Sequence, residues 1–216
     1  MEELKTYIRK HVFGAETQGT LFNQYRHVNS EYDRKDANLT RQKNLMAYCD
    51  QLSDSIDVMF VGIAPGYSGC RFSGVPFASE QTLLGKKKSN FFDPSLYSQS
   101  SNGKPRTENS ATKVWNSISD CVDSTVLPHI FLWNVVPYHP QGQTALSNRD
   151  PEDWETEQYA ALCQGIIDIL KPKQICAFGE IPHKKLKSML KRDIQYIPHP
   201  SRASYTTLKD AYASIF

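Results

Sequence analysis

The sequence predicts a three-layer α/β sandwich in which helices cover both faces of a central four-stranded parallel sheet. Four short apolar runs alternate with helical patterns, and each run ends at a glycine, a proline or a polar turn. Continuous apolar runs are typical of parallel strands buried on both faces. The predicted strands are residues 56–64, 129–136, 173–179 and 193–198. The Ser- and Asn-rich segment 87–112 is predicted to be a long loop, either functional or mobile.

Three helices are predicted around these strands. Residues 155–171 carry apolar side chains at helical spacing on one face, and Asp150 followed by Pro151 predicts where this helix begins. Shorter apolar stripes predict helices at 44–52 and 183–192. The last of these is rich in lysine, which is more typical of a solvated surface than of a DNA-binding face.

Length and composition indicate one globular domain. The chain has 216 residues, of which 22% are charged, and a net charge of +2 with a pI near 8.2. We expect a single domain over 1–216, with an N-terminal helical part at 1–55 and a motif-bearing core at 56–205. Such mild basicity permits a nucleic-acid partner without proving one. The sequence contains no apolar run of membrane-spanning length and no signal peptide pattern, so we expect a cytoplasmic protein. We also expect a monomer that works at the bacterial nucleoid.

The cysteines are scattered along the chain. The sequence contains no C-x-x-C motif and no Cys/His pair at zinc spacing, so free thiols in a reducing compartment are expected. The five residues are Cys49, Cys70, Cys121, Cys163 and Cys176.

Three segments are predicted to meet at one edge of the sheet. Right-handed crossovers place the carboxyl ends of parallel strands together, and ligands bind at that edge. The segments are GIAPGYSG (62–69), NVVPYHP (134–140) and IPHPSRASY (197–205). The glycine spacing in the first matches neither a P-loop nor a dinucleotide-binding fingerprint, so a nucleotide-binding interpretation is unsupported.

Taken together and in this order, the segments resemble the uracil-DNA glycosylase superfamily. GIAPG (62–66) resembles its first motif, and GVPF (74–77) resembles the continuation that supplies an aromatic ring. WNVVPYHP…NRDP (133–151) is similar to the asparagine-bearing strand and loop of the thermostable branch, and HPSRAS (199–204) to the second motif. The resemblance runs from about residue 58 to residue 205.

The resemblance implies an enzyme that flips a nucleotide out of the DNA stack and hydrolyses its N-glycosidic bond, leaving an abasic site. Phe77 would stack on the base, and Asn134 would read its edge with one donor and one acceptor. Ile63 and Ala64 would contribute backbone to the base pocket.

His199 is the first catalytic candidate that the resemblance implies, because a histidine donor would stabilise negative charge on the leaving base. Ser201 would bind a flanking phosphate, and Arg202 would fill the gap left by the flipped base. Further DNA contacts are expected from the glycine-rich turn. They are Pro65, Gly66 and Arg71.

The first motif departs from the family at the position that activates water. Ala64 stands where some branches have Asp or Asn, and Ile63 stands where the thermostable branch has Glu. Glu80 is therefore the second catalytic candidate, because a related branch carries an aspartate at that position. Two alternatives stay open: Glu80 is a solvent-facing residue that begins a helix, or the site relies on leaving-group stabilisation alone.

No metal or cofactor is expected. The thermostable branch holds an iron–sulfur cluster on four cysteines, whereas here the loop at 135–140 has none and only Cys163 falls near an expected ligand. A nucleotide-phosphate hydrolase, a weaker interpretation, would need a magnesium-binding carboxylate cluster that the three loops lack.

Three hypotheses of function remain at this stage. The first is a monofunctional glycosylase that excises uracil or a related base from single- or double-stranded DNA in base excision repair. The second is a glycosylase for a modified base in phage DNA, used in antiviral defence. The third is a catalytically silent DNA- or uracil-binding member of the superfamily.

Overall fold

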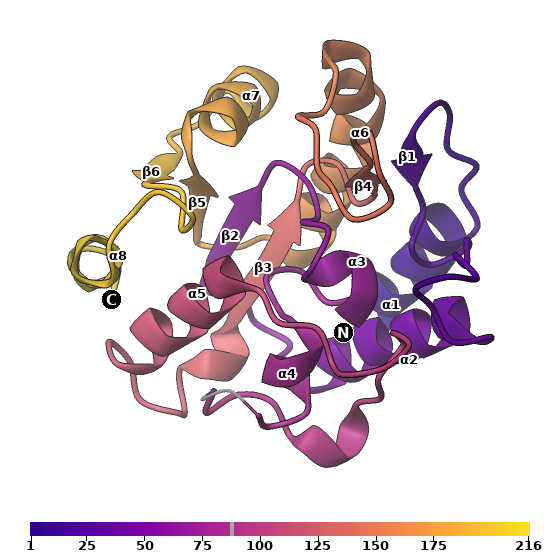
Figure 1. The fold of residues 1–216 in the computed structure, drawn as a ribbon. Coiled ribbons are helices and arrows are strands. Elements are labelled where there is room, and N and C mark those ends of the chain that lie inside the picture. The colour runs from indigo at the N-terminus through magenta and orange to yellow at the C-terminus, as the bar shows by residue number, and fades with distance from the viewer. Residues whose placement is uncertain (87–88) are drawn as a thin grey trace.

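The computed structural model describes residues 1–86 and 89–216 and is built around a four-stranded parallel sheet (Figure 1). The strand order is β3-β2-β5-β6. The strands are β2 (Val58–Gly62), β3 (Ile130–Asn134), β5 (Gln174–Phe178) and β6 (Gln195–Ile197). Each lies inside a range predicted from the sequence. The predicted α/β architecture with a four-stranded parallel sheet is confirmed.

Helices pack on both faces of this sheet. Phe60 of β2 faces Tyr212 of α8 (Tyr205–Ala213), with ring centroids 5.3 Å apart. Phe131 of β3 faces the other way and stacks on Tyr48 of α2 (Ala37–Asp50) at 5.8 Å. The remaining helices are α1 (Glu2–Ile8), α3 (Cys70–Ser73), α4 (Glu80–Leu83), α5 (Asn109–Ser119), α6 (Asp153–Leu170) and α7 (Glu180–Leu190). In Figure 1, α5 and α8 lie on one side of the sheet, and α1, α2 and α6 on the other.

Shorter elements complete the chain. Strands β1 (Leu21–Phe22) and β4 (His139–Pro140) form a separate antiparallel pair. A π-helical turn follows α1 at Arg9–Phe13, and 3₁₀ turns lie at Pro94–Leu96 and Leu127–His129.

The predicted start of α6 is wrong by a few residues. The N-cap is Glu152, which forms a capping box with Glu155, and the helix begins at Asp153. Glu155 Oε2 accepts a hydrogen bond from the Glu152 backbone N–H at 2.8 Å. Asp150 and Pro151 therefore belong to the preceding loop, where they line the cavity described below.

Two other predicted helices begin earlier than their apolar stripes. Helix α2 starts at Ala37 rather than at residue 44. The apolar stripe missed its first turns, because the side chain that they bury is the polar one of Arg41. Helix α7 starts at Glu180 rather than at residue 183. A buried polar side chain hides the first turns of α2 from a pattern of apolar residues, and the first turn of α7 begins with two exposed residues, Glu180 and Ile181.

The predicted loop over 87–112 is only partly a polar loop; residues 87–88 lie outside the described part. Phe91, Phe92 and Tyr97 are buried, and Phe91 stacks on Trp115 of α5 with ring centroids 5.2 Å apart. Ser100 and Ser101 are fully buried as well. Aromatic packing therefore anchors this segment, which then leads into α5.

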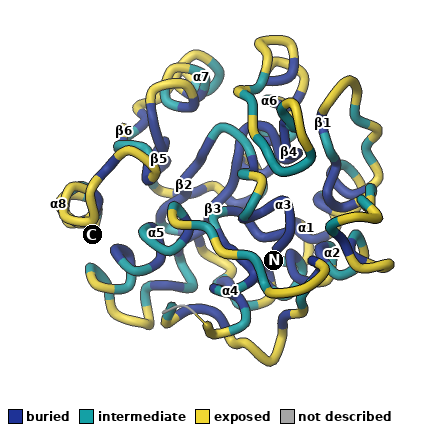
Figure 2. Tube along the Cα trace, viewed as in Figure 1, coloured by how far each residue is buried: buried dark blue, intermediate teal, exposed yellow. Residues whose placement is uncertain are grey.

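The N-terminal part shares a core with the rest of the chain. One cluster of buried apolar residues includes Leu4 and Ile8 of α1, Phe60 of β2 and Leu208 of α8. Figure 2 shows the buried positions running from these helices through the sheet. Within residues 1–86 and 89–216, every helix is too short or too polar to cross a membrane.

Candidate active site

A cavity of about 240 Å³ opens at the carboxyl edge of the sheet, where the loops after β2, β3 and β6 meet. The N-terminal turn of α5 and the loop before α6 complete its wall. Most residues predicted from the motifs line it. They are Ile63, Ala64, Pro65, Gly66, Phe77, Asn134, His199 and Ser201.

Gly62 makes the centre of the site possible. It ends β2 directly opposite Asn134, the last residue of β3. A Cβ at Gly62 would lie 2.4 Å from Phe77 Cζ and 2.7 Å from Asn134 Oδ1. Since neither distance is sterically allowed, only glycine lets the ring and the amide approach each other at this edge.

Phe77 is held in an unusual backbone conformation. Its φ of 52° lies in the left-handed region, which a bulky residue adopts at a cost of order 1–3 kcal/mol. The indole Nε1–H of Trp115 donates a hydrogen bond to the Phe77 carbonyl at 3.0 Å, and the ring packs 4.9 Å from Phe178. The surrounding structure thus fixes a strained aromatic residue in the cavity wall.

Asn134 brings a buried amide into the same wall. The residue is 3% exposed, and its Oδ1 has no hydrogen-bond partner among the residues that the structure describes. An unsatisfied buried polar group costs about 1–3 kcal/mol. The amide is therefore poised to exchange hydrogen bonds with a ligand.

His199 presents a hydrogen-bond donor to the cavity. The backbone N–H of Ser201 donates to Nδ1 at 3.2 Å, and Ser201 Oγ lies 2.7 Å from the same nitrogen. Burial, and then the charge of Arg202, lower the pKa of His199. The neutral ring with Nδ1 as acceptor carries its hydrogen on Nε2.

Glu80, predicted to activate water, lies outside the cavity. It is 1% exposed and accepts hydrogen bonds from the backbone N–H groups of Ser100, Ser101 and Arg106, at 2.7, 2.9 and 2.9 Å. The Ser101 hydroxyl donates to it as well. The residue does begin α4, as the alternative interpretation expected, but it does not face solvent. With both oxygens engaged, Glu80 is a structural carboxylate.

Arg71, predicted to contact DNA, is also turned inward. It is 1% exposed, forms an ion pair with Asp33 and lies 4.4 Å from the Phe22 ring centroid. Arg41 binds the same carboxylate at 2.6 Å. The pattern of the sequence could not reveal this, because Asp33 lies outside every motif.

Glu108 is a cavity residue that the motifs did not identify. It occupies the N-cap position of α5, yet its side chain makes no capping hydrogen bond there. A Cβ at Gly66 would lie 2.3 Å from Glu108 Oε1, and one at Gly69 would lie 2.0 Å from Oε2. Burial raises the pKa of Glu108 to about 7. In the sequence it is one charged residue in a polar segment, so nothing there distinguishes it.

The comparisons with known proteins agree with this site. A family model described as the uracil DNA glycosylase superfamily matches residues 49–215. The chain belongs to this superfamily. Membership confirms the resemblance inferred from the motifs, and identifies the chain in general as a DNA glycosylase whose substrate is DNA.

A solved structure has the same fold as this chain. Wild-type SMUG2 from Pedobacter heparinus matches with a TM-score of 0.63 and 14% identity, over 98% of this chain and 95% of that one. No curated protein is similar enough in sequence to count as a match.

His139 is a second residue that sequence reasoning missed, although it lies inside a quoted motif. It is fully buried on β4, and burial lowers its pKa to about 4, so the ring is neutral. Its Nδ1 lies 3.0 Å from the Pro65 carbonyl, which can only accept, so Nδ1–H donates. His139 thereby fixes the first motif of the glycosylase fold.

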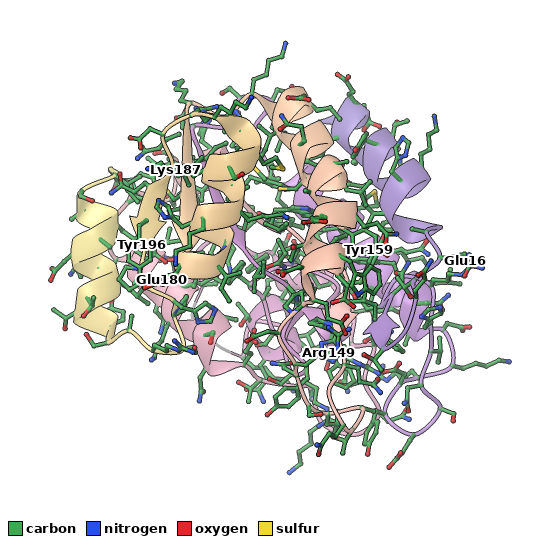
Figure 3. The ribbon with its side chains drawn as sticks, turned by 90° about the horizontal axis from the view of Figure 1, so that it is seen from above. Glu16, Arg149, Tyr159, Glu180, Lys187 and Tyr196 are labelled. Carbon is green, nitrogen blue, oxygen red and sulfur yellow. The ribbon has the colours of Figure 1, made fainter. Side chains whose placement is uncertain are left out.

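The rim of the site includes two arginines. Figure 3, which looks down on the molecule, labels Arg149 on one side and Glu180 and Tyr196 on the other. Arg149 makes a two-pronged ion pair with Glu155. Arg202 is exposed and lines an adjoining cavity of about 740 Å³, which shares His199 with the first.

The donor set does not fit an iron–sulfur cluster or another bound metal. Within the described residues, no group of three or more His, Cys, Asp or Glu side chains could hold a metal ion. Cys163 is buried in α6, where burial raises its pKa to about 12. The absence of a cofactor in the functional protein stays a prediction.

Proposed function

We propose that this superfamily member is a monofunctional DNA glycosylase that flips out uracil or a related base and hydrolyses its N-glycosidic bond. The product is an abasic site for base excision repair. One observation carries the proposal: the Phe77 ring, the unpartnered Asn134 amide and the neutral His199 ring line one small cavity.

The size of the cavity supports a single base as its occupant. At about 240 Å³ it is smaller than the roughly 300–1,000 Å³ typical of pockets for drug-sized ligands. Flipping a nucleotide costs a few kcal/mol, and stacking a base on an aromatic ring returns about 1–3 kcal/mol. Phe77 supplies such a ring, and its strained backbone keeps the ring at the cavity wall.

Each polar side chain has a role in this proposal. Asn134 reads the base edge, with its Oδ1 accepting and its Nδ2 donating. His199 Nε2–H donates to a carbonyl oxygen of the base as negative charge develops there; one such donor typically contributes about 10²–10³ in rate. Its neutral state suits this role, because the hydrogen on Nε2 is fixed by the Ser201 contacts to Nδ1.

The DNA strand is proposed to cross the first and second motifs. The backbone of Pro65 and Gly66 would lie against the sugar, and Arg202 would enter the gap left by the flipped base. The Ser201 hydroxyl can turn toward a phosphate, because its own backbone N–H already occupies His199 Nδ1.

The test is excision from labelled single- and double-stranded oligonucleotides, each with one uracil, xanthine-like or hydroxymethylated base. EDTA is present, and alkali reveals abasic sites. We expect metal-independent product. His199→Ala and Asn134→Ala should each lose about 10²–10³ of the rate with unchanged thermal unfolding. His11→Ala and Asn102→Ala, which lie outside the cavity, are the matched controls.

The lesion panel also separates repair from defence. If a hydroxymethylated base is removed and uracil is untouched, the substrate is a modified base of foreign DNA rather than a deamination product. The same assay is then repeated on phage DNA.

A non-catalytic DNA-binding member is the second candidate. Ala64 in the first motif and the fully hydrogen-bonded Glu80 favour it, since neither can activate water. Tight binding of every oligonucleotide without abasic product, unchanged by His199→Ala, would replace the enzymatic proposal with this one.

A further inference from the structure

Resting on the proposed glycosylase activity, we propose that Glu108 is the general base that activates the hydrolytic water. The residue comes from the segment after α4, not from any of the three motif loops, and its carboxylate lines the cavity beside Gly66 of the first motif. It thus supplies the acid that Ala64 and Ile63 do not.

The orientation of Glu108 is not explained by helix capping. Glu152, the N-cap of α6, uses its side chain in a capping box. Glu108 occupies the same position on α5, but its side chain caps nothing in the described structure. Its carboxylate instead turns away from the helix and onto the glycine-rich turn.

Gly66 and Gly69 leave the space that the carboxylate fills. Side chains at these positions would overlap its two oxygens, at 2.3 and 2.0 Å. No described residue donates a hydrogen bond to the carboxylate or forms an ion pair with it. A partly buried carboxylate without protein donors needs a partner from solvent, and a water molecule in the cavity would supply it.

The environment of Glu108 also suits a base at neutral pH. Burial raises its pKa to about 7, near the pH at which general-base catalysis is most efficient. The other titratable side chains that line the cavity are Cys70, Arg149, Asp150 and His199. Burial raises the pKa of Cys70, so its thiol is neutral, and Arg149 is engaged by Glu155. Of the two carboxylates that line the cavity, Asp150 is exposed, whereas Glu108 is partly buried and has its pKa raised to about 7.

The step balances as follows for a uracil-type substrate. Glu108 takes a proton from water while the water oxygen bonds to C1′ of the deoxyribose. The C1′–N bond breaks, and its electron pair leaves with the base, whose carbonyl oxygen accepts a hydrogen bond from His199 Nε2–H. The proton on Glu108 passes through solvent to the base anion, so that water has been added across the glycosidic bond.

Single-turnover excision between about pH 5 and pH 9 tests this assignment. The wild-type rate should rise about tenfold per pH unit up to roughly pH 7 and then level off. Glu108→Gln should be about 10²–10⁴-fold slower at pH 8, with unchanged affinity for the oligonucleotide, and should lose this acid limb. Glu152→Gln, also an N-cap glutamate, should follow the wild-type profile.

Chemical rescue distinguishes a general base from a purely structural residue, because a small added base can replace only the former. Glu108→Ala should be slow, and added formate or azide should restore part of its rate without changing that of the wild type. If Glu108→Gln retains the wild-type rate and acid limb while the wild type is active, this inference is overturned and the proposed function stands. A wild type inactive on every base overturns both.

Discussion

Two glutamates of this protein have opposite surroundings, although they lie on either side of the same segment of chain: Glu80 is fully buried, and Glu108 is partly buried at the cavity. Glu80 receives three backbone N–H groups and one hydroxyl. The carboxylate of Glu108 receives no donor from the described residues and borders a cavity. A carboxylate with every lone pair engaged belongs to the scaffold, whereas one kept desolvated and unpaired is available for a ligand.

The two residues are also connected through the chain. Glu80 holds the backbone of Ser100, Ser101 and Arg106, and Glu108 follows two residues later. The structural acid thus anchors the segment that carries the other acid into the cavity. The sequence candidate for water activation acts, in this structure, by positioning its neighbour.

The largest effect on stability should come from removing Glu80, the hydrogen-bonded acid. Glu80→Ala leaves three backbone donors buried without a partner, so we expect the free energy of unfolding to fall by roughly 3–5 kcal/mol. Glu180→Ala is the matched control, because Glu180 is also the first residue of its helix but is exposed. It should change stability by less than about 1 kcal/mol. Urea denaturation measures both, and equal losses would remove the distinction between the two acids.

Removing the charge of Glu108 should instead raise the free energy of unfolding. Its folded-state pKa of about 7 lies above the ordinary value of 4.5, so the folded protein binds this proton more tightly. The resulting destabilisation is absent below about pH 4.5, grows as pH rises, and is complete above about pH 7. Glu108→Gln should therefore raise the free energy of unfolding by up to about 3 kcal/mol at pH 8. At about pH 4.5 it should change little. A variant less stable than wild type at pH 8 would contradict the burial of an unpaired charge.

A smaller effect should follow from crowding Glu108. Gly69→Ala places a methyl group 2.0 Å from Oε2, so the carboxylate must move, at a cost of about 1–3 kcal/mol. Excision should fall with it. Gly14→Ala, whose Cβ meets nothing within 4 Å, is the control. It should leave the excision rate unchanged and the free energy of unfolding unchanged or slightly raised. An active, fully stable Gly69→Ala would show that the carboxylate does not need its present place.

Two arginines show the same contrast between a paired and an available side chain. The smallest expected effect is on the salt dependence of DNA binding. Arg71 is paired and buried, whereas Arg202 is exposed beside the site. Arg202→Ala should lower the salt dependence of DNA affinity by about 0.9 in log–log slope, because one cation fewer then displaces counterions from the duplex. Lys187→Ala, on the exposed face of α7, should leave the slope unchanged. Fluorescence anisotropy over a salt series measures both, and equal slopes for the two variants would extend the DNA footprint to α7.

Much of the fold followed from the sequence because it depends on local patterns. The four strands are continuous apolar runs, which period and length alone identify, and their carboxyl ends must meet at one edge. Phe77, Asn134 and His199 were predicted because the motifs that contain them resemble those of the uracil-DNA glycosylase superfamily. Helix starts were predicted less well, because Arg41 and Glu152 use side-chain contacts rather than apolar spacing.

Which acid faces the cavity was decided only by the tertiary structure. Glu80 stands directly after the glycine-rich turn, yet its oxygens are claimed by backbone donors from residues 100–106. Glu108 stands about forty residues from Gly66 and Gly69. The packing of Phe91 and Phe92 around Trp115, together with the hydrogen bonds of Glu80 to residues 100–106, brings it to them. The sequence by itself determined the sheet, its functional edge and the residue types of the motifs. The pairing of buried charges depends on contacts between distant segments, so no local pattern encodes it.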